Sequence, residues 1–540
     1  MKKNDSDITV IKKLIKKGSN VNYEDESQNT SLHWASSKGH LEISEYLIES
    51  GAEIDKVNSY GCTSLINALR NEHVELAKML IMAGADVNKA AANKDKPLFL
   101  AIERGYIDIV ELLLSKGAKV NYVIGCIYTP LLIAVERNQL EMVEVLVNAG
   151  AEINQVAQIS PLCMAARQDY KPIVELLLSK GASVNLTGSS GISPLFAASY
   201  NGHLEVMKTL IAAGADINMK DKLGETALYN AVSQNQLKVV DLLLTEGANV
   251  LLKYKRDERT TLILAAEKGY TEIAKSLISF KSSVDTVDLF DNTPLFVAAE
   301  NNHLKIVQLL IQKGADVNKQ NMLGETPLFK ASENGHLAVV QYLLESGANI
   351  NIPRLGKETP LYTTIKKGQP EVAGYLIKEG ADINAADENG ETPLYLAVLE
   401  SRTKIVKQLI IAGANINSNI TYDQPIIHIA ASQGNMEILT MLVEAGANVH
   451  TIERYYGATT LHSAITSVNP EAVKYMIKLG VDVNKTSQNG RTALHFACMI
   501  KQEEMVKYLL ASGANPTIKD SMGDKAIDLT NDLKIKKMLE

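Results

Sequence analysis

The stretch Gly324–Asn351 reads GETPLFKASENGHLAVVQYLLESGANIN, and a close variant of it returns about every 33 residues along the 540-residue chain. Thr326 and Pro327 predict the start of a helix, because an N-cap hydroxyl accepts a free backbone N–H and proline fits the first helical position. Gly335 and Gly347 predict two helix ends, because glycine adopts the left-handed conformation at little cost. Each copy therefore predicts two short helices joined by a tight turn.

The apolar residues of this stretch predict which helix faces are buried. In the first helix, one face carries Leu328, Ala331 and Ser332. In the second helix, the apolar stripe consists of Leu337, Val340, Leu343 and Leu344. Isolated helices this short are marginal in water, so the copies must stack and share a continuous core.

The repeated stretch resembles the ankyrin repeat, which has a 33-residue period and a T-P-L-H-x-A signature. The signature leucine falls at Leu32, Leu65, Leu98, Leu131, Leu162, Leu195, Leu228, Leu262, Leu295, Leu328, Leu361, Leu394, Ile427, Leu461 and Leu494. The resemblance implies an all-α ankyrin-repeat solenoid, in which helix-turn-helix repeats with extended connecting turns wind into a curved superhelix. We expect fifteen full repeats over residues 23–519.

The two ends of the array depart from this pattern. Residues 1–22 contain only the second helix of a repeat, expected over Asp5–Lys17, and residues 520–540 lack the usual signature. A final helix is expected from Asp532 to Leu539. Because terminal repeats need a polar outer face, we interpret these lysine-rich ends as half-repeat caps.

The repeat spacing is irregular at three places. Leu162 falls two positions earlier than the period predicts, and Leu262 and Leu461 each fall one position later, so we place these changes in the connecting turns, where length is tolerated. The turn Leu251–Arg259 reads LLKYKRDER, and Lys281 stands where other repeats have the helix-ending glycine. A left-handed lysine costs roughly 1 kcal/mol or more, so residues 250–285 are predicted to form a local weak point or bend.

Composition and charge limit the class of protein. The net charge is −7, and strong nucleic-acid binders usually carry a basic excess, so we expect no nucleic-acid partner. The N-terminus has no continuous apolar core for a signal peptide, and no run is long enough to span a membrane. The four cysteines lie in four different repeats and form no C-x-x-C pair. We expect a monomer in the reducing cytoplasm, or in a host's cytoplasm if the protein is an effector.

No group of residues predicts catalysis, a cofactor or a metal site. Nine of the ten histidines occupy the signature or Gly-His positions of successive repeats, so they are spread along the array and are expected to make structural hydrogen bonds. The Val-Asn and Ile-Asn endings, such as Asn88, are expected to stabilise turns. A nucleophile needs an orienting base and an oxyanion site, which the repeats do not offer. We interpret the chain as non-enzymatic.

Apolar and aromatic residues at the turn tips are the remaining candidates, because turn tips are usually polar and aromatics and arginines anchor interfaces. In ankyrin proteins, partners lie along the concave side and touch the turn tips and the exposed ends of the first helices. The first candidate group is Tyr254, Arg256, Arg259, Lys268, Leu289, Phe290, Met322 and Leu323. The second candidate group is Tyr422, Arg454, Tyr455 and Tyr456. The alternative is that these are scattered surface residues without a shared role.

These observations favour a scaffold or adaptor that binds a protein partner along the concave groove. A pathogen or viral effector that captures a host protein would have the same sequence features. A small-molecule sensor or an enzyme is a third alternative, which no polar constellation supports.

Overall fold

The computed structural model describes residues 4–125, 127–254, 256–417 and 424–540. The regular elements in these ranges are α-helices and one 3-10 helix, η1. Extended pairing within the same ranges is limited to isolated bridges such as Ile124 with Tyr128. The all-α prediction is therefore confirmed.

The chain divides into two compact units. The first contains Met1–Thr261 and Ser279–Lys281, and the second contains Leu262–Ile278 and Ser282–Glu540. The division thus falls inside residues 250–285, the segment in which the sequence shows its irregular turn and its missing glycine.

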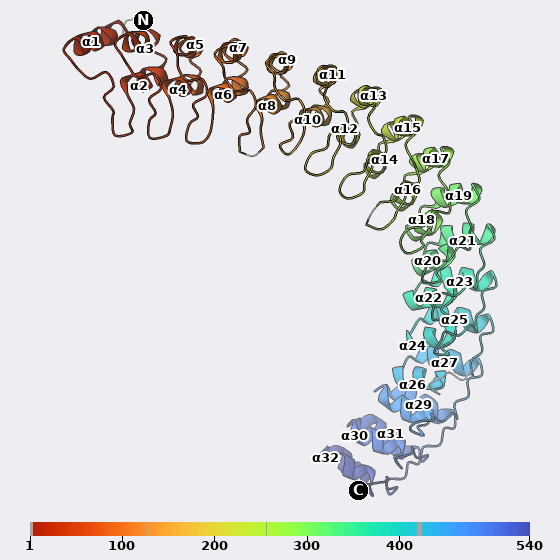
Figure 1. The fold of residues 1–540 in the computed structure, drawn as a ribbon. Helices are drawn as coiled ribbons and strands as arrows, with labels where there is room; N and C mark the ends of the chain where they lie inside the picture. The colour runs from red at the N-terminus through yellow and green to blue at the C-terminus, as the bar shows by residue number, and fades with distance from the viewer. Residues whose placement is uncertain (1–3, 126, 255, 418–423) are drawn as a thin grey trace. The chain divides into compact units, whose positions relative to one another are not determined.

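In the first unit, two parallel rows of helices follow α1 (Asn4–Lys16), and the connecting loops extend from the row of first helices (Figure 1). The first helices are α2 (Ser31–Lys38), α4 (Ser64–Arg70), α6 (Pro97–Arg104), α8 (Pro130–Glu136), α10 (Pro161–Arg167), α12 (Pro194–Asn201) and α14 (Ala227–Ser233). The second helices are α3 (Leu41–Glu49), α5 (Val74–Met82), α7 (Ile107–Ser115), α9 (Leu140–Asn148), α11 (Lys171–Ser179), α13 (Leu204–Ala212) and α15 (Leu237–Thr245). Within this unit, successive first helices pack on each other from α2 to α14, and successive second helices pack on each other from α3 to α15.

The second unit repeats this arrangement. Its first helices are α16 (Thr261–Lys268), α18 (Pro294–Glu300), α20 (Pro327–Glu333), α22 (Pro360–Lys367), α24 (Pro393–Leu399), α26 (Ile426–Gln433), α28 (Thr460–Thr466) and α30 (Ala493–Met499). Its second helices are α17 (Thr271–Ser279), α19 (Leu304–Gln312), α21 (Leu337–Glu345), α23 (Pro370–Lys378), α25 (Thr403–Ile411), α27 (Met436–Glu444), α29 (Pro470–Lys478) and α31 (Glu503–Ala511). They are followed by η1 (Ala526–Leu529) and α32 (Leu533–Leu539).

The first helix of the quoted repeat forms as its sequence predicts. The Thr326 hydroxyl accepts the N–H of Phe329 at 3.1 Å, and Pro327 is the first residue of α20. This cap satisfies one of the free donors of the first turn. The predicted face is confirmed, because Leu328, Ala331 and Ser332 are all fully buried.

The second helix buries a slightly different stripe from the predicted one. Val339, Val340 and Leu343 of α21 are completely buried, whereas Leu337 and Leu344 are only half-buried. The helix begins at Leu337, which places this residue at the edge of the interface rather than at its centre. In most second helices the core contact is thus a pair of adjacent apolar residues and the leucine one turn later, whereas α3 has Ser44 in the pair and α29 has Met476 in place of the leucine.

An asparagine at the end of each of several repeats joins it to the next repeat. The side chain of Asn88 donates to the carbonyl of Gly117 at 3.0 Å and accepts the N–H of Lys119 at 2.8 Å. We call this pair of hydrogen bonds the asparagine link. The same link is made by Asn22, Asn121, Asn154, Asn318, Asn417 and Asn484. These asparagines do more than stabilise their own turns, since both partners lie in the following repeat.

The predicted strained lysine is confirmed. Lys281 has φ +67°, whereas the equivalent position of the next repeat is Gly314 with φ +86°. A side chain in this left-handed region crowds the neighbouring carbonyl group, which glycine avoids.

Within the described residues, eight of the nine histidines in the signature and Gly-His positions make structural hydrogen bonds, as predicted, and His40 is the exception. His33 contacts the hydroxyl of its own N-cap, Thr30, at 2.9 Å and the carbonyl of Cys62 in the next repeat at 3.0 Å. In the Gly-His position, Nε2 of His303 contacts the carbonyl of Glu267 at 2.9 Å. Burial lowers the pKa of His33, and it lowers the pKa of His428 to about 4. These imidazoles are therefore neutral at pH 7 and act as hydrogen-bonding parts of the core.

Candidate protein-interaction surface

Tight loops precede the first helices, and in several of them an aspartate or asparagine side chain fixes the shape of the loop. We call these loops fingers. In the finger 288–292, one carboxylate oxygen of buried Asp288 accepts the N–H groups of Phe290 and Asn292, both at 2.9 Å. Because these bonds hold the backbone from the inside, the side chains at the tip point outward. Leu289 and Phe290 are consequently at least half-exposed.

The next finger, 321–325, has the same construction with an asparagine in place of the aspartate. Oδ1 of Asn321 accepts the N–H groups of Leu323 at 3.0 Å and Glu325 at 2.9 Å. Gly324 closes the turn with φ +76°, and a Cβ added there would lie 3.2 Å from the backbone nitrogen of Leu355. Glycine is required at this position by both the backbone conformation and the close approach of the following finger.

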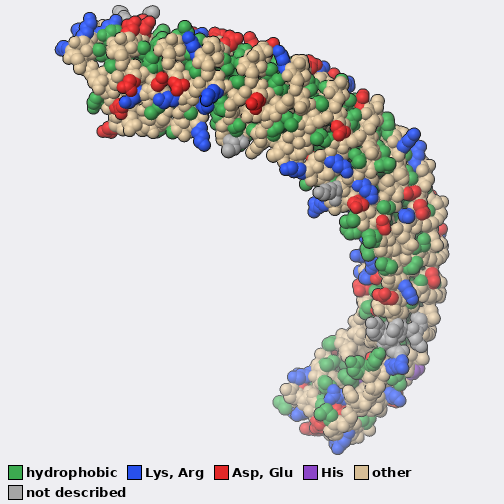
Figure 2. Space-filling view, viewed as in Figure 1, with side chains coloured by type: hydrophobic (Ala, Val, Ile, Leu, Met, Phe, Trp, Pro, Cys, Tyr) green, Lys and Arg blue, Asp and Glu red, His purple; other side chains and the backbone are tan. Residues whose placement is uncertain are grey.

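Successive fingers of the second unit are joined to each other through their backbones. The N–H of Met322 donates to the carbonyl of Phe290 at 3.0 Å, and the N–H of Leu355 donates to the carbonyl of Leu323 at 2.8 Å. The result is a continuous line of five apolar side chains, each 50–67% exposed. We call it the apolar row, and it consists of Leu289, Phe290, Met322, Leu323 and Leu355. Hydrophobic side chains gather on the loop side of the second unit in the space-filling view (Figure 2).

Ion pairs stabilise the third finger, residues 354–358, on its buried side. The guanidinium of Arg354 lies 2.6 Å from a carboxylate oxygen of Glu358 and 3.5 Å from one of Glu325. Both carboxylates are buried, and Arg354 also lies 5.6 Å from the centre of the Phe329 ring. Removing one member of such a buried pair leaves an uncompensated charge. These contacts therefore hold the finger that carries Leu355 in one position.

The structure places five residues of the first predicted group in the second unit. Leu289, Phe290, Met322 and Leu323 all belong to the apolar row. Lys268 is the last residue of α16, is exposed, and lies 3.5 Å from Glu267.

The sequence prediction missed Leu355, the most exposed member of the row. It occupies the position in its finger that Met322 occupies in the preceding finger, so register alone would have identified it. The unusual neighbours Pro353 and Arg354 hide this equivalence in the sequence.

The other three residues of the first predicted group belong to the first unit. Tyr254 is half-buried because its ring stacks on Tyr229, with centroids 5.0 Å apart and an angle of 19° between the planes. Arg259 pairs with Asp257 at 3.0 Å, and Arg256 is exposed. The stack makes Tyr254 part of the intramolecular packing of its finger, which weakens its case as an interface anchor.

The second predicted group is partly described. Tyr422 lies outside the described residues. Tyr455 and Tyr456 are 62% and 67% exposed at the tip of the finger that precedes α28, beside exposed Arg454. The carbonyl of Tyr456 accepts the N–H of Gln488 in the following finger at 2.8 Å. This is the same finger-to-finger bond that organises the apolar row, but the two tyrosines stand without apolar side chains on the next tip.

The described residues offer neither a membrane span nor a metal centre. None of the described helices combines the length and apolar character needed to cross a membrane. Within the described ranges, no three His, Cys, Asp or Glu side chains are grouped so that they could hold a metal ion.

Comparison with known proteins identifies the family. A family model described as ankyrin repeats in three copies matches residues 2–91, 53–124, 85–157, 162–254, 262–354, 352–420 and 427–520. The chain therefore belongs to the ankyrin repeat family. Arrays of this family are generally non-enzymatic, and membership supports a protein–protein interaction module.

Solved structures include ankyrin repeat domains that resemble parts of this chain. The ankyrin repeat domain of Bcl-3, described as a unique member of the IkappaB protein family, shares 24% identity at a TM-score of 0.37. The human ASB11 ankyrin repeat domain shares 28% identity at a TM-score of 0.36. Each comparison covers 40% of this chain and 98% of the other chain. No curated protein matches the sequence.

Proposed function

We propose that this protein is a non-enzymatic scaffold or adaptor that holds a protein partner on the apolar row. The observation that carries the proposal is the row itself, in which five large apolar side chains stand exposed on three hydrogen-bonded fingers. Exposed apolar side chains that occur singly need no explanation, whereas a contiguous line of them is typical of an interaction surface. Phe290 is the natural anchor, because aromatic residues dominate the binding energy of interfaces.

The construction of the fingers supports tight binding. Their tips are already fixed by Asp288, Asn321 and the Arg354 ion pairs before any partner arrives. A partner then loses little free energy to ordering the loops, so more of the apolar contact appears as affinity.

The proposal includes a reducing, cytoplasmic location and a monomeric chain. Cys62, Cys163 and Cys498 are all free and buried, and burial raises the pKa of Cys163 and Cys498 to about 12. Thiols of this kind behave as small hydrophobic core residues and need no oxidising compartment.

A pull-down with three versions of the intact chain tests the proposal. The row variant carries Phe290→Ser, Met322→Ser and Leu355→Ser. The matched control carries Met82→Ser and Ile411→Ser, which remove apolar side chains of similar exposure, 62% and 76%, from the ends of α5 and α25. Circular dichroism melts establish that all three versions are folded. The lysate is from the source organism, and bound proteins are identified by mass spectrometry.

We expect at least one partner that the wild-type chain and the control retain and the row variant loses. Titration of that purified partner should show affinity weakened about a hundredfold or more, since three truncated anchors each cost roughly 1 kcal/mol or more. Partners that bind all three versions equally would show that the apolar row is not the interaction surface.

A further inference from the structure

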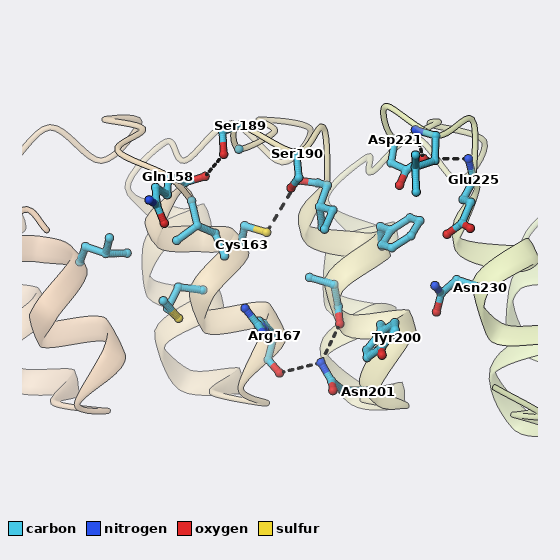
Figure 3. Close-up of a pocket in the computed structure, with 18 of the residues that line it drawn as sticks. Gln158, Cys163, Arg167, Ser189, Ser190, Tyr200, Asn201, Asp221, Glu225 and Asn230 are labelled. Atoms are coloured by element: carbon cyan, nitrogen blue, oxygen red, sulfur yellow. Dashed lines mark hydrogen bonds between the residues drawn. The ribbon is translucent and has the colours of Figure 1, made fainter. Parts of the chain in front are cut away.

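The first unit contains a groove that begins where the repeat spacing is shortened. The finger before α10 is shorter than those on either side, because Leu162 follows Leu131 two positions earlier than the period predicts. The groove has a volume of about 610 Å³ and reaches from Leu132 of α8 past α10 and α12 to α14 (Figure 3). It lies entirely within the first unit and shares no residue with the apolar row.

The short finger and the one after it are packed closely enough to define one wall. The N–H of Ser189 donates to the carbonyl of Gln158 at 3.0 Å. A Cβ added to Gly188 would lie 2.4 Å from the same carbonyl oxygen, so only glycine permits this approach. The close contact between the two fingers therefore fixes the position of this wall of the groove.

The middle of the groove is apolar. Cys163 and Met164 of α10 and Phe196 of α12 line it, together with Ile159 and Ile192 from the two fingers. Cys163 and Phe196 are almost completely buried, so the floor is a continuous part of the core. Ile159, Met164 and Ile192 are half-buried, and a side chain of the size of leucine or phenylalanine would remove their exposed apolar surface from water.

The part of the groove between α10 and α14 carries opposite charges at its two ends. Arg167, the last residue of α10, is exposed and forms no ion pair with any described residue. At the other end, Asp221 and Glu225 lie on the finger before α14 (Figure 3). Neither carboxylate has a basic partner within the described part of the chain. In the second unit, by contrast, the equivalent Glu325 is paired with Arg354.

Two further observations show that polar groups at the acidic end of the groove lack a hydrogen-bond or charge partner among the described residues. Asn230 lines the groove and is only 6% exposed, yet its amide oxygen has no hydrogen-bond partner. Burial, and then the nearby charge of Asp221, raise the pKa of Glu225, while a hydrogen bond from Asn230 lowers it. A cationic donor at this point would stabilise both carboxylates and satisfy the free acceptor.

We propose that this groove binds an extended peptide segment of a protein partner that carries a basic, an apolar and an acidic side chain in that spatial order. The basic side chain pairs with Asp221 and Glu225. The apolar side chain packs on Ile159, Met164 and Ile192, and the acidic side chain pairs with Arg167. The proposal rests on the proposed role in protein binding but concerns a second and separate site.

The dimensions of the groove set the length of the peptide. Helices of successive repeats pack about 8–10 Å apart, so α10 and α14 are separated by roughly 16–20 Å. An extended chain rises about 3.3 Å per residue, and about five or six residues span this distance. The basic and acidic residues should therefore be separated by about five or six positions.

Selection from a library of random twelve-residue peptides displayed on phage, with the intact chain as the bait, tests the proposal. Enriched peptides are synthesised with a fluorescent label and titrated by anisotropy. The protein variants are Glu225→Gln, Arg167→Ala, and Ser190→Trp, which places a large ring at an exposed position on the groove. The row variant serves as the control, and circular dichroism melts confirm that every variant is folded.

We expect enriched peptides to share the basic, apolar and acidic pattern. Glu225→Gln and Arg167→Ala should each weaken binding about tenfold, as loss of one charge partner typically does. Ser190→Trp should remove binding, and the row variant should bind as the wild type does. In a chain with both Arg167→Glu and Glu225→Arg, a peptide with its two charged residues exchanged should bind again.

Selection without this pattern, or peptides that bind the Ser190→Trp variant with unchanged affinity, would overturn the assignment of the groove. So would failure of the charge-exchanged pair when the protein is folded. Each of these results leaves the pull-down on the apolar row unaffected, so the two proposals fail independently.

Discussion

The backbone N–H of Met322 donates to the carbonyl of Phe290, so two fingers from successive repeats are joined at their tips. A second bond from Leu355 to Leu323 extends the connection to a third finger. Side chains from three different repeats thereby become neighbours on one surface. The spacing of the apolar row follows from the stacking of repeats and not from any local sequence motif.

Gly324 is predicted to be essential for this arrangement. Gly324→Ala introduces a Cβ into a residue at φ +76°, 3.2 Å from the nitrogen of Leu355. We expect a loss of stability of about 1–2 kcal/mol from the left-handed backbone and the close contact. Urea denaturation measures this loss, and exchange of the Leu355 amide should become faster. As a control, Gly347→Ala meets no atom within 4 Å and should show only the conformational cost.

The asparagine link predicts that different substitutions of Asn88 lower the free energy of unfolding by different amounts. Asn88→Ala removes the acceptor for the Lys119 N–H and the donor to the Gly117 carbonyl, and we expect a loss of about 1–2 kcal/mol. Asn88→Asp keeps the acceptor and loses only the donor, so its loss should be smaller. Chemical denaturation followed by circular dichroism compares the two. Equal losses would show that the acceptor contributes nothing.

Lys281 is predicted to be a site of stored strain. Lys281→Gly should stabilise the protein by about 1 kcal/mol, because glycine adopts φ +67° without the crowding that a side chain causes. The reciprocal change, Gly314→Lys, should cost a similar amount at φ +86°. Hydrogen exchange of residues 262–278 measures the local effect. A destabilised Lys281→Gly variant would mean that the lysine side chain makes a contact worth more than the strain.

Stability should fall in mild acid because of His428. Its ring hydrogen-bonds to Ser463 and Thr451 in the core, and burial lowers its pKa from 6.5 to about 4. Between these two values the unfolded chain binds a proton that the folded chain does not. The contribution of the neutral His428 ring to the free energy of unfolding is therefore complete at pH 7 and is lost progressively as the pH falls from 6.5 to 4.

The expected loss from His428 is on the order of 3 kcal/mol across this range. Thermal melts between pH 7 and pH 4 should show a shallower decline for His428→Gln than for the wild type. His33, His462 and His495 also have lowered pKa values caused by burial, so some decline should remain. Exposed His450 provides the matched control, and His450→Gln should retain the full decline.

The fold was predictable because its determinants are local and repeated. Thr326, Pro327 and Leu328 specify a cap, a helix start and a buried position by chemistry that needs no distant partner. The exposed tips at Phe290 and Met322 were predictable for the same reason, since position in the repeat determines exposure.

Features that depend on neighbouring repeats were not predictable from one repeat at a time. The stack of Tyr254 on Tyr229 joins side chains of successive repeats, and register does not reveal that the rings meet. The groove over Cys163 lies beside a finger that is two residues shorter than the repeat period predicts. A shortened spacing of this kind forms no motif that sequence analysis could recognise as a groove. The shortened spacing before Leu162 was visible in the sequence, but only the structure shows what the missing residues uncover.

The asparagine link also has a consequence for how such a chain changes length over generations. Each link connects one repeat only to its successor, and the donor and acceptor sets at both ends of a repeat are the same. Where adjoining repeats both carry the link, as those of Asn88 and Asn121 do, duplication or excision of one complete repeat therefore leaves the remaining junctions chemically intact. Recombination within the gene can lengthen or shorten the array by whole repeats without requiring a new interface. Gain or loss of a partial repeat would leave the hydrogen-bond donors and acceptors of one junction without matching partners.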